Sequence, residues 1–261
     1  MYDLAALDLV LAGTFFAGKL HYSPVTDSTN SDAIDAARHS APHGSVYLAD
    51  EQLAGRGRGD HAWDSDAGEG LYVSVLLRPQ LPAVRLPLFP LAVGLAAAEA
   101  IRAAAGLTVD LRWPNDLLIG PKKVGGILVE SKTSGGSVDF VVAGVGINVH
   151  QRTFALDLST PATSLDLEAV RRLSRQDLLV FLLESLEREA LGLADAAVDA
   201  TIPARVEEAS TWIRGRRVEV HGPQACTGIT AGLDEHGFLR VRTEDGMVTV
   251  QTGGIRAVEM S

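Results

Sequence analysis

The sequence predicts an α+β fold, in which a large domain of strands and flanking helices precedes a small C-terminal β-barrel. The chain has 261 residues, of which 46% are hydrophobic, and can therefore bury a sizeable core. Apolar, strand-like runs alternate with helix-like segments over roughly the first 200 residues. The last ~50 residues are short alternating segments separated by glycine-containing turns. We expect the two domains to span residues 1–211 and 212–261.

The first part of the large domain contains one predicted helix and two predicted strands. Ser28-Thr29-Asn30 precedes an alanine-rich stretch that ends at His39, and such polar residues are typical of a helix start, where they can act as caps. Residues 45–49 and 71–77 are apolar and are expected to form strands. Between them, residues 55–70 form a polar, glycine-rich loop, and a loop of this length in a compact domain usually has a function.

The remaining elements follow from similar patterns. A helix over residues 91–105 should end at Gly106, and residues 109–113 lead into the turn Pro114-Asn115-Asp116. Further elements are expected as a strand hairpin, a strand, a long helix and a short helix, at residues 117–119 with 124–131, 140–149, 174–193 and 204–209. In the barrel, strands are expected at residues 217–220, 237–242 and 247–251.

Charge and cysteine content disfavour several classes of protein. Acidic residues outnumber lysine and arginine by 33 to 23, which gives a formal net charge of −10 and argues against nucleic acid as a main partner. Cys226 is the only cysteine, so the chain can build neither an internal disulfide nor a thiolate metal cluster, as in proteins of a reducing compartment. We expect Cys226 to pack in the barrel core.

No segment is expected to enter a membrane. The N-terminus has no basic residues before its short apolar stretch, which argues against a secretory signal. Alanine dominates the most apolar stretch, residues 86–105, and four residues interrupt it: Pro87, Pro90, Glu99 and Arg102. This stretch is therefore predicted to be a buried core helix rather than a membrane span. The expected location is the cytoplasm.

The most unusual segment is the loop Gly55-Arg56-Gly57-Arg58-Gly59-Asp60-His61-Ala62-Trp63. Glycines allow close backbone approach, and arginine binds phosphate or carboxylate oxygens through paired hydrogen bonds. The loop thus predicts a phosphorylated ligand. It is neither a P-loop, because no Gly-Lys-Ser/Thr follows, nor a dinucleotide fingerprint. The alternatives are a solvated surface loop or an RNA-binding segment, which its position between two strands of an acidic globular protein disfavours.

Two glycine-bearing strands are expected to form a bed for this ligand. Gly125 and Gly126 follow Lys123 in a segment that ends at Glu130, and Gly144 and Gly146 precede Asn148. Glycine weakens a strand, and a common reason to keep it is that a ligand or another backbone lies against that surface. The ammonium of Lys123 can then project over the ligand. The alternative is that Lys123 and the preceding turn residues are ordinary solvated turn formers.

Taken together and in this order, the motifs resemble those of the biotin protein ligase family. The match joins Ser28-Thr29-Asn30, Gln52, the arginine-glycine loop, Arg112-Trp113-Pro114-Asn115-Asp116 and the glycine-bearing strands, and extends over essentially the whole chain. It implies a class II synthetase-like biotin/lipoate ligase catalytic domain, with a mixed β-sheet and flanking helices, followed by an SH3-like β-barrel. The resemblance is to members that lack an N-terminal DNA-binding domain.

The resemblance also implies a role for individual residues. Biotin would be bound by Ser28, Thr29, Asn30, Gln52, Gly55, Arg56, Arg58, Lys123 and Gly126. ATP and the adenylate would be bound by Arg56, Gly57, Arg58, Trp63, Asn115, Asp116, Lys123, Asn148 and Arg256. The catalytic residues would be Lys123, Arg58 and Asp116. Mg²⁺ would accompany ATP, and the sequence identifies no ligand set for it.

The activity implied is ATP-dependent formation of biotinyl-5′-AMP, followed by transfer of biotin to a lysine. The implied partner is the biotin carboxyl carrier protein domain of a carboxylase such as acetyl-CoA carboxylase. A lipoate or octanoate ligase or transferase is the nearest alternative, although those relatives lack the arginine-glycine loop. A biotin-binding module without turnover is the other, and Lys123 disfavours it. Exposed strand edges could pair two copies into a homodimer.

Two departures from the family pattern carry further expectations. The family loop usually has another arginine before the tryptophan, whereas His61 stands here and Asp60 adds a negative charge. Because imidazole is mostly neutral at pH 7, we expect a weaker hold on pyrophosphate or adenylate. About 20 residues precede the strand-and-helix core, too few for a helix-turn-helix domain, so operator binding is not expected.

Overall fold

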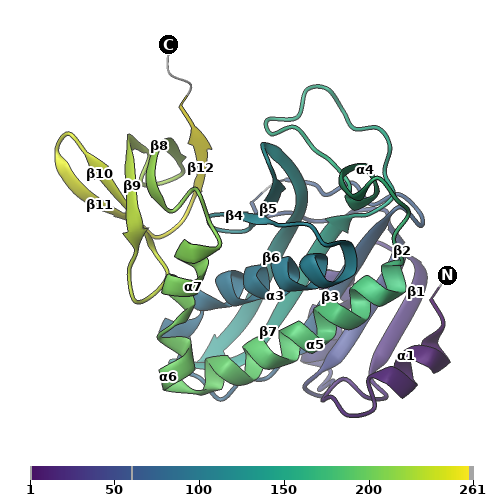
Figure 1. The fold of residues 1–261 in the computed structure, drawn as a ribbon. Helices are drawn as coiled ribbons and strands as arrows, with labels where there is room; N and C mark the ends of the chain where they lie inside the picture. The colour runs from purple at the N-terminus through teal and green to yellow at the C-terminus, as the bar shows by residue number, and fades with distance from the viewer. Residues whose placement is uncertain (1, 60, 259–261) are drawn as a thin grey trace.

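The computed structural model describes residues 2–59 and 61–258 and contains two β-sheets, the larger of which is flanked by helices (Figure 1). The larger sheet has seven strands in the order β1-β2-β3-β7-β6-β5-β4. The pair β1 and β2 is parallel and the other neighbours are antiparallel, so the sheet is mixed, as predicted. Its strands are β1 (Leu20–Thr26), β2 (Ser45–Gln52), β3 (Gly70–Leu77), β4 (Asp110–Arg112), β5 (Asp116–Ile119), β6 (Lys122–Ser134) and β7 (Ser137–Asn148).

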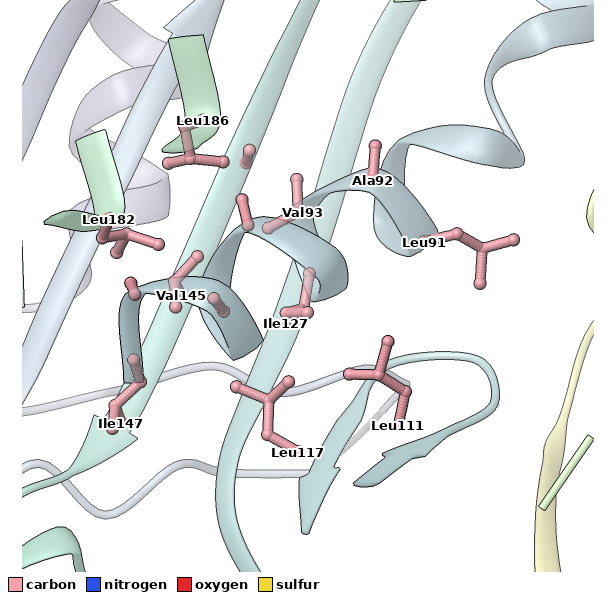
Figure 2. Packing of buried hydrophobic residues seen from close by; sticks show 14 of the residues in the cluster. Leu91, Ala92, Val93, Leu111, Leu117, Ile127, Val145, Ile147, Leu182 and Leu186 are labelled. Atoms are coloured by element: carbon pink, nitrogen blue, oxygen red, sulfur yellow. The ribbon is translucent and has the colours of Figure 1, made fainter. Parts of the chain in front are cut away.

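Two long helices, α3 (Leu88–Ala105) and α5 (Arg175–Ala194), run across one face of this sheet (Figure 1). In Figure 2, Val93 of α3 and Leu182 of α5 lie near Val145 of β7 in a continuous apolar core. Helix α3 is long and apolar enough to span a membrane, yet 56% of it is buried inside the protein. The prediction of a buried core helix is confirmed.

The opposite face of the sheet is covered only in part by a helix. Helix α2 (Thr29–Arg38) packs over β2, β3 and β7 and buries Ala33 and Ala37 against Leu76 and Val142. Successive side chains of a strand point to opposite faces, so this face and the α3 face receive alternating residues of each strand. Beyond the start of α2, the face carries small and polar residues, where the cavity described below lies.

The C-terminal sheet has five antiparallel strands in the order β11-β10-β9-β8-β12. They are β8 (Arg214–His221), β9 (Cys226–Leu233), β10 (Leu239–Thr243), β11 (Gly246–Val250) and β12 (Gly254–Ala257). Sequence patterns predicted β8, β10 and β11 but did not reveal β9 or β12, because β9 mixes glycine and threonine with its apolar residues and β12 is only four residues long. Cys226 is partly buried at the start of β9 and packs against the core.

Shorter elements complete the chain: α1 (Leu4–Val10), η1 (Ala83–Arg85), α4 (Leu165–Ala169), α6 (Ala196–Asp199) and α7 (Ile202–Glu208). Helix α7 leads into Trp212, whose ring centroid lies 5.3 Å from the guanidinium of Arg112 and 3.8 Å from that of Arg216. Trp113 donates a 3.1 Å hydrogen bond to Gly237 of the C-terminal part. These contacts hold the second sheet against the β4–β5 edge of the first. The boundary predicted between residues 211 and 212 falls in the connection from α7 to β8.

Most predicted helix ends are confirmed, with one correction. Ser174 caps α5 by accepting a hydrogen bond from Asp177 N, and Gly106 ends α3 in a left-handed conformation. Ser28 occupies the N-cap position of α2, but its side chain makes no capping hydrogen bond. Capping therefore does not account for the polar residues at the start of α2.

Candidate active site

A cavity of about 860 Å³ lies on the sheet face that α2 leaves open, between the arginine-glycine loop and the C-terminal sheet. In the register of the sheet, Ser74 of β3 pairs with Gly144 of β7, and Gly146 pairs with Gly126 of β6. These residues line the cavity floor. All but one of the predicted site residues also line it: Ser28, Thr29, Asn30, Gln52, Arg56, Gly57, Arg58, Trp63, Asn115, Asp116, Lys123, Gly126, Asn148 and Arg256.

The exception is Gly55, which is buried beneath the loop. Its carbonyl accepts a 2.9 Å hydrogen bond from Trp63 N, while Gly57 N donates a 2.7 Å bond to the carbonyl of His61. These bonds fold the loop back on itself as a small hairpin. A side chain at Gly55 would collide with the Trp63 carbonyl. The structure thus gives Gly55 a reason to be glycine that needs no ligand.

One part of the cavity is lined by neutral polar side chains, all of them buried except the partly exposed Gln52, here called the neutral set: Ser28, Thr29, Asn30, Gln52 and Ser74. Ser28, Thr29 and Asn30 are only 2–4% exposed. Ser74 Oγ donates to Asn30 Oδ1 at 2.6 Å and lies 2.8 Å from Thr29 Oγ1. Gln52 Oε1 accepts from Thr29 N at 2.9 Å. A buried polar group must find such partners or cost stability, so this network fixes the side chains of Thr29, Asn30 and Ser74 in place.

A second part of the cavity is lined by ionised side chains, here called the charged set: Arg58, Asp116, Lys123 and Arg256. Asp116 lies at the start of β5, where its carboxylate forms ion pairs of 2.6 Å with both Lys123 and Arg112. Burial acts to raise the pKa of Asp116, but attraction to these two cations outweighs it, and the pKa lies below its ordinary value. Asp116 is therefore an ionised counter-charge that holds Lys123 in the cavity.

The two loop arginines have different partners. Arg56 forms an ion pair with Glu130 of β6 and donates a 3.2 Å hydrogen bond to Ser31. Arg58 reaches the C-terminal sheet, where it donates to the carbonyl of Gly253 and, at 2.6 Å, to Thr252 Oγ1. Burial lowers the pKa of the Arg58 guanidinium, although the nearby Asp116 acts in the opposite sense. The loop is thus tied to both parts of the molecule.

Trp63 lies directly on the glycine floor. A Cβ atom at Gly146 would stand 2.7 Å from the Trp63 ring, and one at Gly126 would stand 3.1 Å from it. Lys123 Nζ lies 5.5 Å from the ring centroid. The glycines were expected to admit a ligand or a backbone, and the side chain against them here is an indole. Trp63 Nε1 is buried and has no hydrogen-bond partner among the described residues.

The remaining predicted residues differ in their surroundings. Asn115 donates to the carbonyl of Ile127, and Asn148 to that of Thr163, so both amides brace neighbouring backbone. Arg256 is exposed on β12, and His61 is exposed at the cavity edge. Asp60, the other unusual loop residue, lies outside the described residues.

Sequence reasoning assigned no role to three residues that the structure ties to the site. Arg112 and Glu130 lay within quoted motifs, yet only the structure shows their pairing with Asp116 and Arg56. Ser74 had one available signal, since it is the lone serine in a run of aliphatic and aromatic residues at 71–77, and its side chain is fully buried.

Comparison with known proteins identifies the family that shares this architecture. Residues 22–148 match the Biotin/lipoate A/B protein ligase family, and residues 214–255 match the Biotin protein ligase C terminal domain. A biotin--[acetyl-CoA-carboxylase] ligase of Mycobacterium tuberculosis is 33% identical over 88% of this chain and 85% of its own length. This chain belongs to the biotin protein ligase family.

Two further proteins are similar to this chain, one in sequence and one in fold. A bifunctional ligase/repressor BirA from Bacillus spizizenii is 32% identical over 90% of this chain and 73% of its own length. The solved structure of an Aquifex aeolicus biotin protein ligase in complex with biotin and ATP superposes with a TM-score of 0.78 at 28% identity, covering 92% of this chain and all of the other. The family and the α+β fold class predicted from the sequence are confirmed.

Proposed function

We propose that this ligase forms biotinyl-5′-AMP from biotin and ATP and then transfers biotin to a lysine of a carrier protein. The observation that carries the proposal is the joining, in one cavity, of a buried neutral set with a charged set centred on Lys123. A neutral ring rich in donors and acceptors suits the neutral set, and phosphate and carboxylate oxygens suit the charged set.

In the first half-reaction the ionised biotin carboxylate would attack the α-phosphate of ATP. A bond forms between a carboxylate oxygen and phosphorus, and pyrophosphate leaves with the electron pair of the broken bond. No base is needed, so the protein's contribution would be alignment and charge neutralisation. Lys123 is suited to this task because Asp116 fixes its ammonium within the cavity. The Trp63 indole would stack on adenine, and Arg58 would release Gly253 and Thr252 to bind the new acyl phosphate.

In the second half-reaction the amine of an acceptor lysine would attack the acyl carbon, forming an amide and releasing AMP. The amine must lose a proton to act as a nucleophile. Asp116 is poorly suited to accept it, because its pKa lies below the ordinary value and two cations already engage its carboxylate. We infer that Asp116 acts electrostatically rather than as the base.

Mg²⁺ would neutralise phosphate charge when it is bound with ATP. The described residues contain no group of three or more histidine, cysteine, aspartate or glutamate side chains placed to hold a metal ion. Mg²⁺ usually binds through nucleotide phosphates with one or two carboxylates. Both oxygens of Asp116 already pair with Lys123 and Arg112, so the phosphates of ATP would supply most of the protein-bound ion's ligands.

The carrier proposed as acceptor is the biotin domain of a carboxylase such as acetyl-CoA carboxylase, in the cytoplasm. The protein would be incubated with Mg-ATP, a biotin carboxyl carrier domain and either biotin or lipoate, and the carrier then weighed by intact mass spectrometry. The proposal predicts the mass increment of one biotinyl group with biotin and no change with lipoate. Lipoylation of the carrier, or an unmodified carrier under both conditions, would contradict it. Size-exclusion chromatography with light scattering tests whether two copies pair into a homodimer.

A further inference from the structure

Glu130, near the middle of β6, touches residues on two sides of the cavity without lining the cavity itself. Its carboxylate forms an ion pair with Arg56 of the loop through Oε1 and accepts a 2.9 Å hydrogen bond from Asn30 Nδ2 through Oε2. The proposed reaction uses Asn30 for biotin and Arg56 for both ligands. Glu130 is therefore the shared partner of a neutral-set amide and a loop arginine.

The contact with Asn30 fixes the orientation of a side chain that could otherwise be turned by 180°. Asn30 Nδ2 donates both to Glu130 and to the carbonyl of Leu128, at 3.2 Å, while Asn30 Oδ1 accepts from Ser74. An amide has two donors and one acceptor oxygen, and these three bonds are compatible with one orientation only. Removing the Glu130 carboxylate removes one of the bonds that define it.

From Asn30 the hydrogen bonds continue to the far limb of the same loop. They run through Ser74 to the Thr29 hydroxyl, and from the Thr29 backbone N–H through Gln52 and Ser65 to the carbonyl of Trp63, with separations between 2.6 and 3.1 Å. This series of hydrogen bonds thus begins at Arg56 and ends at Trp63, so both limbs of the loop are attached to the neutral set. Glu130 is the one ionised member between Arg56 and the neutral residues, and its side chain is only 26% exposed.

We propose that Glu130 is a positioning residue, which sets the Asn30 amide for the biotin head group and at the same time holds the Arg56 limb of the loop over the cavity. The part of the inference that concerns biotin rests on the proposed function, whereas the part that concerns the loop rests on contacts within the protein. Loss of the carboxylate charge should loosen the loop, while loss of the whole side chain should also weaken biotin binding.

The test compares full-length Glu130→Gln and Glu130→Ala with the parent and with Asp139→Asn, a carboxylate-to-amide control on β7 that does not line the cavity. Trypsin cleavage after Arg56 and Arg58 is followed by mass spectrometry, with and without biotin. Biotin affinity is measured by calorimetry without nucleotide. Thermal melting confirms that each variant is folded.

For Glu130→Gln we expect loop cleavage about two- to fivefold faster than in the parent, because a partly exposed ion pair is lost, and biotin affinity within about twofold. Glu130→Ala should match that cleavage and also bind biotin about tenfold more weakly, since a buried amide loses its partner. Asp139→Asn should behave as the parent. If Glu130→Ala does not fold, loop cleavage in the Gln variant still shows whether Glu130 holds the loop.

Parent-like cleavage of the Gln variant, in the absence of biotin, would overturn the inference. So would equal biotin affinities of the Ala variant and the parent. A parent protein that binds no biotin would instead overturn the proposed function, and the cleavage comparison without biotin would still decide whether Glu130 holds the loop.

Discussion

The neutral set and the charged set share one cavity but differ in how their side chains are held. Ser28, Thr29 and Asn30 are buried, and the last two are hydrogen-bonded within the protein. Arg58 and Lys123 are partly exposed, and their partners are a carbonyl and hydroxyl of a loop and a carboxylate, respectively. A neutral ligand is best recognised by groups already fixed in place, because a buried polar group without a partner is costly.

The charged set has the opposite requirement. Phosphate groups arrive, move apart and leave during the proposed reaction, so the cations that bind them must be able to exchange partners. Arg58 can exchange the Gly253 carbonyl for a phosphate oxygen without leaving a buried charge unpaired. We therefore propose that the neutral set determines which acid binds and that the charged set determines how fast it reacts. The predictions below test this division.

The largest effect is expected for Lys123→Ala. The ammonium is a cavity cation that Asp116 holds in place, and removal of one preorganised electrostatic contact to a transition state costs about 10²- to 10³-fold in rate. Adenylate formation, measured by rapid quench, should fall by that factor. Lys122→Ala is the matched control, because Lys122 is the adjacent lysine and pairs instead with Glu168 at 2.9 Å. Full activity of Lys123→Ala would remove Lys123 from the catalytic set.

Ser74→Ala tests the neutral set in isolation. Loss of the buried hydroxyl leaves Asn30 Oδ1 and Thr29 Oγ1 each short of a partner, which should cost about 1–2 kcal/mol, or roughly tenfold in biotin affinity. The maximal rate at saturating biotin should change little. Ser131→Ala, an exposed serine on β6, is the control. A lowered maximal rate with unchanged biotin affinity would show that the two sets do not divide the work as described.

Arg58→Gly should release the adenylate several-fold faster. The variant loses both a cation near the acyl phosphate and the tie between the loop and residues 252–253. Release can be followed by chasing labelled biotinyl-5′-AMP with unlabelled adenylate. Arg58→Lys keeps the charge but not the paired hydrogen bonds, so its adenylate release rate should lie between those of Arg58→Gly and the parent. Equal release rates in Arg58→Gly and the parent would defeat the role given to Arg58.

The smallest effect is expected for His61→Arg. A permanent positive charge at the cavity edge should tighten ATP and adenylate binding about two- to threefold at pH 7, since exposed charges contribute little. The gain should shrink as salt is added. Calorimetry with a non-hydrolysable ATP analogue at two ionic strengths measures the gain in nucleotide affinity and its dependence on salt. Unchanged affinity would show that the loop does not need a third arginine here.

Local sequence patterns were sufficient for the parts of the molecule that rest on local chemistry. The glycines of β6 and β7 and the arginine-glycine loop were recognisable because each breaks a rule for ordinary strands or loops. Lys123 was recognised by its place beside these glycines and by the family resemblance. The structure brings Trp63 and these glycines together as a site should, although it also shows that Trp63 itself fills the space above Gly126 and Gly146.

Long-range contacts could not be predicted in this way. The bond from Arg58 to Gly253 joins residues 195 positions apart, and that from Asn30 to Glu130 joins residues 100 apart, distances over which no local pattern carries information. Ser28 occupies the N-cap position but makes no capping hydrogen bond. The neighbouring Thr29 and Asn30 take part in the polar network of the cavity instead. Strands β9 and β12 depend on pairing with their neighbours rather than on their own composition.

The central claim is that the neutral set selects the acid that the charged set activates, and exchange of labelled pyrophosphate into ATP tests it most directly. The account predicts exchange that requires biotin, is absent with lipoate alone, and is lost in Lys123→Ala while calorimetry still detects biotin binding to that variant. Exchange without any acid, or equal exchange with lipoate, would contradict it.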